Sequence, residues 1–192
     1  MIYFFKYSNT INDTVKNIFT AYFNYLEHQR AYSKNTLIAY NQDLDNFCTF
    51  IASYKETILT EDILTQLDRV DFRSFLSNRR EGYKNSQTSL ARNVSSLRSF
   101  YGYIEQNYGI KNEAIFLMPS PKGKQTIIRS VEYNDILCLL KEVELNAKTD
   151  WIAMRDVAFF ITLYATGMRI SEILSITLSD YNSISDLSLI HI

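Results

Sequence analysis

The chain has 192 residues, enough for one well-formed hydrophobic core or for two small ones. Hydrophobic residues at 46% and charged residues at 21% exclude wholesale disorder, and the scarcity of glycine (5) and proline (2) disfavours a turn-rich all-β fold. Charge is uneven: residues 1–68 hold 5 Lys/Arg and 8 Asp/Glu, residues 69–129 hold 11 and 4, and residues 130–192 hold 4 and 9. A basic segment between two acidic ones predicts a polyanionic partner, the alternative being a solvated helical surface with chance clustering.

The sequence carries no signal for a membrane, a leader peptide or a metal site. No apolar run approaches the roughly 20 residues that span a bilayer, and residues 1–6 are too short for a signal peptide. Cys48 and Cys138 match no metal-ligand spacing and fall on the apolar stripes of predicted helices. We therefore expect two buried free thiols, no disulfide, no metal, no cofactor and a cytoplasmic protein.

Two amphipathic helices are predicted first, from apolar residues at three- and four-residue steps. The first covers residues 12–28, and the second follows a polar break at 31–36 that is rich in N-cap residues. Their apolar stripes are Val15, Ile18, Tyr22, Tyr25 and Leu26, and then Leu37, Tyr40, Leu44, Phe47 and Ile51.

Residues 60–81 are predicted to hold a short helix and then a longer one that ends near Gly82. A further helix spans residues 86–107. Because four helices of this size joined by short loops form a bundle, we expect a domain over 12–108. The stripes of the last two helices are Val70, Phe72, Phe75 and Leu76, and then Leu90, Val94, Leu97, Tyr101 and Ile104.

Residues 109–130 lose the helical period and gather glycine, proline and lysine, which predicts a basic linker lying along something negative. Helical patterning resumes at 131–146 and 151–165. The second of these helices is apolar on most faces, as a core helix is, and a core helix needs a surrounding domain. Since fewer than 30 residues follow it, we expect 131–186 to be an unfinished second domain.

The helix at 86–107 carries candidate phosphate contacts beside its apolar stripe. Small hydroxyls let a helix approach a phosphate backbone, and arginine adds charge and forked hydrogen bonds. Free N–H groups at the start of the helix near residue 36 suit a phosphate too. The alternatives are ordinary surface for the first group and simple N-capping for the second. The candidates are Lys84, Arg92, Ser95, Ser96, Arg98 and Ser99, together with Ser33, Lys34, Asn35 and Thr36.

The sharpest local feature lies at residues 163–174. A core helix is predicted to end at Gly167 and to restart with Arg169 in the first turn of the next helix, near the positive end of its dipole. Glu172 follows three residues later on the same face, placed to orient the guanidinium. Such an arginine can stabilise charge on a transferring phosphoryl group, and a surface Arg–Glu pair explains the pattern equally well.

At these residues the chain resembles the tyrosine recombinase (phage integrase) family, and is similar to its Xer-type members. The likeness covers nearly all of residues 12–180. In the N-terminal part it rests on residues 33–36, Tyr40, Asp43-Leu44, Phe47, Ser89-Leu90-Ala91-Arg92 and 97–101; further on, it rests on residues 164–172.

The resemblance implies a mainly α fold, with a four-helix core-binding (SAM-like) domain followed by the helical beginning of an integrase-type catalytic domain. It implies an enzyme that cuts double-stranded DNA through a tyrosine nucleophile, without metal, cofactor or small-molecule ligand, and that works as a tetrameric synapse of recombinase protomers. Arg169 would be the first catalytic arginine and Glu172 the acidic residue that supports it.

The family's catalytic lysine, His-x-x-Arg motif, second His or Trp and nucleophilic tyrosine have no counterparts in this sequence. We therefore expect the chain alone to be inactive. Residues 187–192 are what the DNA sequence CTGTCTCTTATACACATC encodes, a transposon end used to tag sequencing libraries, which predicts a non-native tail. The alternative is a genuine β-strand.

Two other function classes stay open at this point. One is a non-catalytic DNA-binding or regulatory protein that uses a core-binding domain. The other is a helical protein-interaction module with incidental basic charge, which leaves residues 166–172 unexplained.

Overall fold

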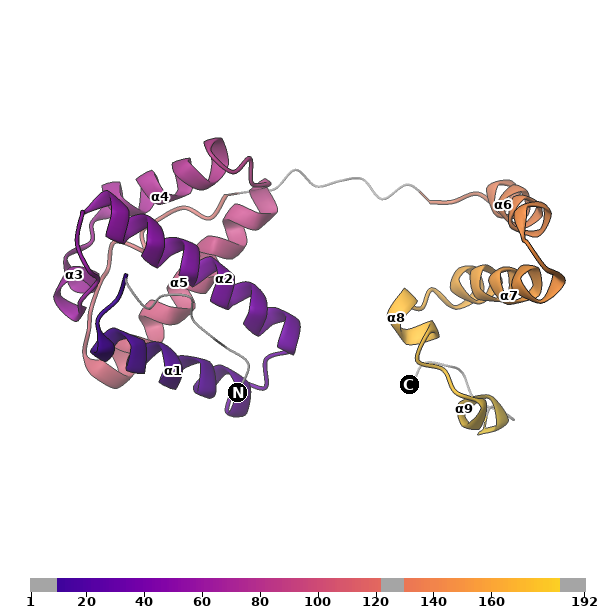
Figure 1. The fold of residues 1–192 in the computed structure, drawn as a ribbon, viewed down its shortest axis with the longest axis horizontal. Helices are drawn as coiled ribbons and strands as arrows, with labels where there is room; N and C mark the ends of the chain where they lie inside the picture. The colour runs from indigo at the N-terminus through magenta and orange to yellow at the C-terminus, as the bar shows by residue number, and fades with distance from the viewer. Residues whose placement is uncertain (1–9, 122–129, 184–192) are drawn as a thin grey trace. The chain divides into compact units, whose positions relative to one another are not determined.

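The computed structural model describes residues 10–121 and 130–183. The chain divides into two compact units, unit 1 over Met1–Gln125 and unit 2 over Thr126–Ile192 (Figure 1). The described parts of both units are built from helices, and their β-type pairing is an isolated bridge between Ile11 and Leu59. The predicted mainly α fold is confirmed.

Unit 1 contains five helices in its described residues, and a side chain caps the start of each one. The caps are Asn12, Ser33, Thr60, Asp68 and Ser86, whose side chains accept hydrogen bonds from backbone N–H groups in the first turn. The helices are α1 (Asp13–His28), α2 (Lys34–Tyr54), α3 (Glu61–Gln66), α4 (Arg69–Glu81) and α5 (Gln87–Tyr108).

The core of unit 1 is aromatic and joins all of these helices. The rings of Phe19 and Phe100 stack at 4.4 Å, and those of Phe47 and Phe72 at 5.7 Å. The predicted apolar stripes supply only part of this core, because Phe19, Phe23 and Phe100 are buried although none of them was on a predicted stripe. Of the predicted stripe residues, Tyr25, Tyr40 and Leu76 are half-buried and pack against the core, whereas Val70 is 58% exposed.

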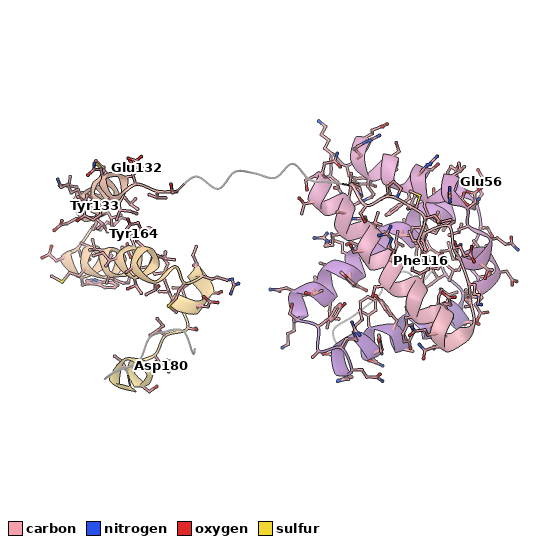
Figure 2. All side chains as sticks on the ribbon, turned by 180° about the vertical axis from the view of Figure 1, so that it is seen from behind. Glu56, Phe116, Glu132, Tyr133, Tyr164 and Asp180 are labelled. Carbon is pink, nitrogen blue, oxygen red and sulfur yellow. The ribbon has the colours of Figure 1, made fainter. Side chains whose placement is uncertain are left out.

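Residues 109–121, called the strap below, follow α5 and pack back onto unit 1. Gly109 ends α5 with a φ of +69°, a left-handed conformation that favours glycine. Asn112, Ile115 and Met118 are buried, whereas Phe116 is 43% exposed (Figure 2). The strap was predicted as the first part of a basic linker along a negative partner; it is instead part of the packed unit. Residues 122–129 of that predicted linker lie outside the described residues.

Unit 2 contains α6 (Tyr133–Asn146), α7 (Asp150–Thr166), α8 (Ile170–Ile173) and α9 (Leu178–Ser183) in its described part. Tyr133 of α6 and Tyr164 of α7 are both largely exposed (Figure 2). Among the described hydrophobic residues of this unit, Ala153 alone is buried. Helix α7 was expected to be a core helix, but it packs mainly on α6 and α8, so its remaining faces stay open.

The two cysteines differ. Cys48 is buried in unit 1, as predicted, and burial raises the pKa of its thiol. Cys138 was also expected to be buried and is exposed, because α6 buries no residue within the described part of unit 2. The proposed tail at 187–192 lies outside the described residues.

Across residues 10–121 and 130–183, none of the helices combines the length and apolar character needed to cross a bilayer. The same stretches contain no group of three or more His, Cys, Asp or Glu side chains arranged to hold a metal ion.

Candidate functional site

Helices α2 and α5 pack against each other in unit 1, and both begin on the same side of it, at the right in Figure 1. Each begins after a serine whose hydroxyl accepts a hydrogen bond from the backbone N–H three residues later. Ser33 accepts from Thr36 at 3.2 Å, and Ser86 accepts from Ser89 at 3.1 Å. The remaining N–H groups of the first turn and the helix dipole give each end a partial positive charge, which favours an anionic partner on this side.

The predicted contacts at the start of α2 divide into caps and exposed groups. The hydroxyl groups of Ser33 and Thr36 are hydrogen-bonded to each other, with their oxygens 2.9 Å apart, and Ser33 also caps the start of α2. Lys34 and Asn35 are exposed in the first turn. On the other helix, Lys84 is exposed in the loop before α5, with a φ of +51°. Lys34 and Lys84 are therefore exposed cations on this side of unit 1.

Arg92 of α5 forms an ion pair with a buried carboxylate of α2. Its Nε donates to Asp43 Oδ2 at 2.8 Å, and its Nη2 donates to Oδ1 at 3.1 Å. Burial raises the pKa of the Asp43 carboxyl, while the hydrogen bonds from Arg92 act to lower it. The same hydrogen bonds raise the pKa of Arg92. Because the Arg92 side chain is 45% exposed and that of Asp43 only 2%, this arginine ties α5 to α2 and still reaches the surface.

The three predicted serines of α5 have different surroundings. Ser95 is exposed. Ser96 is fully buried and donates to the carbonyl oxygen of Asn93 at 3.0 Å. Ser99 accepts a hydrogen bond from the Tyr22 hydroxyl of α1 at 2.8 Å. Since α5 packs on α1 as well as on α2, its exposed stripe is narrower than expected, and Ser96 and Ser99 belong to the packing rather than to the surface.

Arg98, predicted as a surface cation, holds the strap instead. Its Nη1 donates to Ser120 Oγ at 3.1 Å, and its Nη2 donates to the carbonyl oxygen of Met118. Longer contacts of 3.5 Å reach the carbonyl oxygens of Ile115 and Phe116. The arginine thereby satisfies backbone acceptors of a segment that has no regular structure of its own.

A cleft of about 370 Å³ lies where the end of the strap meets α4 and the first turn of α5. Leu76, Leu90 and Met118 form its apolar part, while Arg73 and Arg80 add positive charge at its rim. The side of unit 1 near the start of α5 is thus basic over α4 as well.

Asp43 was part of the family pattern in the sequence, but its structural role was missed. It lies three residues after Tyr40 and four before Phe47, on the flank of the apolar stripe of α2. A carboxylate at a core-facing position needs a basic partner, and that signal pointed to an arginine elsewhere in the chain. The sequence could not say which one.

In unit 2, Gly167 ends α7 with a φ of +66°, which confirms the predicted turn. Arg169 then stands at the N-cap of the four-residue helix α8, one position before the predicted first turn. Its Nη1 donates to Glu172 Oε1 at 2.7 Å, and its backbone N–H donates to Oε2, also at 2.7 Å. These bonds lower the pKa of Glu172. The Arg169 side chain is 83% exposed, so the guanidinium is tethered on one side and open to an anion on the other.

Comparison with known proteins gives a consistent result. Residues 19–107 match the family model for the phage integrase N-terminal SAM-like domain. The chain is similar to tyrosine recombinase XerC of Rickettsia typhi, with 36% identity over 154 residues that cover 80% of this chain and 50% of that protein. Tyrosine recombinase XerC of Rickettsia canadensis is 30% identical over 167 residues, covering 87% of this chain and 54% of the relative. The chain spans about half the length of the curated relatives it matches, and no solved structure matches it.

Proposed function

The chain belongs to the tyrosine recombinase family, and from this premise we propose that unit 1 grips double-stranded DNA for a site-specific recombinase. The proposed DNA-contact surface lies where α2 and α5 begin. Exposed Lys34 and Lys84 and the outward part of Arg92 contact backbone phosphates, and the two capped helix ends add their partial charges. Contacts of this kind position a protein on DNA without reading its sequence.

The observation that carries this proposal is the clustering of these groups on one side of unit 1. Two helices that are far apart in the sequence both begin on that side, α5 at its upper and α2 at its lower part in Figure 1. Arg73 and Arg80 of α4 add further positive charge beside the start of α5. A side with this much positive charge attracts a polyanion over a distance and raises its association rate.

For the whole protein we propose strand cleavage and rejoining through a phosphotyrosyl intermediate, in a tetrameric synapse in the cytoplasm. Arg169 would contact the scissile phosphate, and Glu172 would orient its guanidinium through the two bonds described above. The chain by itself would not cleave DNA. Tyr22 and Tyr101 are core residues whose pKa values are raised by burial, the opposite of what a nucleophile needs.

The test is binding of this chain to a short random-sequence duplex, measured by fluorescence anisotropy over a series of salt concentrations. We expect binding at low salt, and we expect the logarithm of the association constant to fall linearly with the logarithm of the salt concentration. Lys34→Gln and Lys84→Gln should each reduce the magnitude of the slope by about 0.9, because each lysine that leaves a phosphate no longer displaces a counterion.

Lys16→Gln is the matched control. Lys16 is exposed in the first part of α1, twelve residues before that helix ends at His28, a separation of about 18 Å at the rise of an α-helix. Its loss of charge should leave the slope unchanged. Folded wild-type protein that fails to bind the duplex at low salt would refute the proposed function.

A further inference from the structure

The Asp43–Arg92 pair gives the proposed DNA-binding side a pre-oriented guanidinium. The carboxylate is almost completely buried and accepts hydrogen bonds from α5, among them two from Arg92, at 2.8 and 3.1 Å, and one from Asn93 Nδ2, at 3.2 Å. A carboxylate that accepts bonds on both oxygens holds the planar guanidinium in one orientation.

The bonds engage Nε and Nη2 of Arg92 and leave Nη1 for a further acceptor. Since the side chain is 45% exposed, that acceptor can come from outside the protein. An arginine that is already ordered loses little conformational freedom when it meets a phosphate, whereas a free surface arginine must first be immobilised.

We propose that Asp43 is a positioning residue, which holds Arg92 so that Nη1 meets a backbone phosphate between the N-terminal parts of α2 and α5. The inference rests on the proposed function, because it assumes that this side of unit 1 binds DNA. It assigns to a buried acid, rather than to another surface cation, a share of the DNA affinity.

The positioning role and simple electrostatics predict opposite effects of the Asp43→Asn substitution on DNA affinity. Asp43→Asn keeps the size of the side chain and removes a negative charge near the DNA, which by Coulomb attraction alone strengthens binding. If Asp43 positions Arg92, the variant binds about tenfold more weakly, since one charge-assisted hydrogen bond is lost. The salt slope should also fall by about 0.9 as that phosphate contact disappears.

Two further variants separate positioning from stability and from net charge. Asp62→Asn makes the same change of charge at an exposed site in α3, at the left in Figure 1, and should leave the affinity and the slope at their wild-type values. Arg92→Lys keeps both charges of the pair but cannot make the forked contact. It should therefore reproduce the losses of Asp43→Asn.

Each protein is first shown to be folded by circular dichroism, and binding is then measured with the same random-sequence duplex. A folded Asp43→Asn variant that binds as tightly as wild type, or more tightly, with an unchanged slope overturns the positioning role. If Asp43→Asn does not fold, a folded Arg92→Lys variant with wild-type affinity and slope overturns it instead. Wild-type protein that does not bind at all rejects the proposed function itself, a different result from either of these.

Discussion

Arg92 also matters for the stability of unit 1, because Asp43 has its ion-pair partner in that residue. Breaking a fully buried ion pair by removing one partner costs about 3–5 kcal/mol, since the other charge stays buried and unpaired. Here Arg92 is partly solvated, so Arg92→Gln should lower the free energy of unfolding by about 2 kcal/mol. For this reason alanine variants of Arg92 are poor probes of DNA contact by themselves.

That destabilisation should depend on pH. Burial already raises the pKa of folded Asp43, and losing Arg92 removes an opposing influence, so the pKa rises further. The unfolded chain releases the proton near pH 4, as a free Asp does, while the folded variant keeps it to higher pH. The stability of Arg92→Gln should therefore fall as pH increases above about 4 and through the raised folded pKa. Urea unfolding of wild type and variant across this range measures the difference, and a gap that stays constant with pH would contradict the argument.

At the scale of elements, polar side chains and buried apolar side chains together hold the strap against the helices of unit 1. Asn112 Nδ2 donates to the carbonyl oxygens of Leu64 at 3.0 Å and Leu67 at 2.8 Å, which fixes the strap to the end of α3 and the residue that follows it. Arg98 of α5 fixes the strap to that helix by donating to Ser120 and to the carbonyl oxygen of Met118. Ile115 and Met118 then bury their side chains beneath it. The end of the strap is thereby placed beside the start of α5.

Arg98→Ala should release the strap. The lost charge-assisted hydrogen bonds should reduce the free energy of unfolding of unit 1 by about 2 kcal/mol. Chymotrypsin should cleave faster after Phe116, which is already part exposed. Arg30→Ala, at an exposed arginine that follows α1, is the matched control and should change neither quantity. Equal cleavage rates for the Arg98 variant and wild type would show that the apolar anchors hold the strap without it.

At the scale of the whole molecule, the two units have different degrees of packing. Unit 1 has an aromatic core that joins its helices, whereas the described part of unit 2 leaves large apolar side chains such as Trp151 and Met154 exposed, at 62% and 72%. Exposed apolar surface of this extent is costly in water. The difference agrees with a chain that spans about half the length of its relatives.

The proposal that this chain binds DNA without cleaving it can be tested directly. Incubation with a nicked duplex that traps covalent intermediates should yield no protein–DNA adduct that survives denaturation, although the DNA is bound. A full-length XerC relative on its own nicked site serves as the positive control. An adduct formed by this chain would show that one of its tyrosines acts as a nucleophile and would reject the proposed division of roles.

The sequence by itself determined what depends on neighbours along the chain. Apolar spacing of three and four residues marked the helices of unit 1, since residues at these steps share one face. The glycine at 167 and the polar break at 31–36 located helix ends, because capping and left-handed backbone are local properties. The motif at 164–172 likewise joined residues close enough in sequence to form the Arg169–Glu172 pair.

Only the tertiary structure decided which polar residues face outward. Arg92, Arg98 and Ser99 looked alike as surface groups, yet their partners are Asp43, Ser120 and Tyr22, which lie 49, 22 and 77 residues away. Helical periodicity gives the direction of a side chain around its own axis, but not which other helix or strap covers that direction. The same reason explains the buried strap and the exposed Cys138: burial depends on what packs against a segment, and that is a property of the folded chain as a whole.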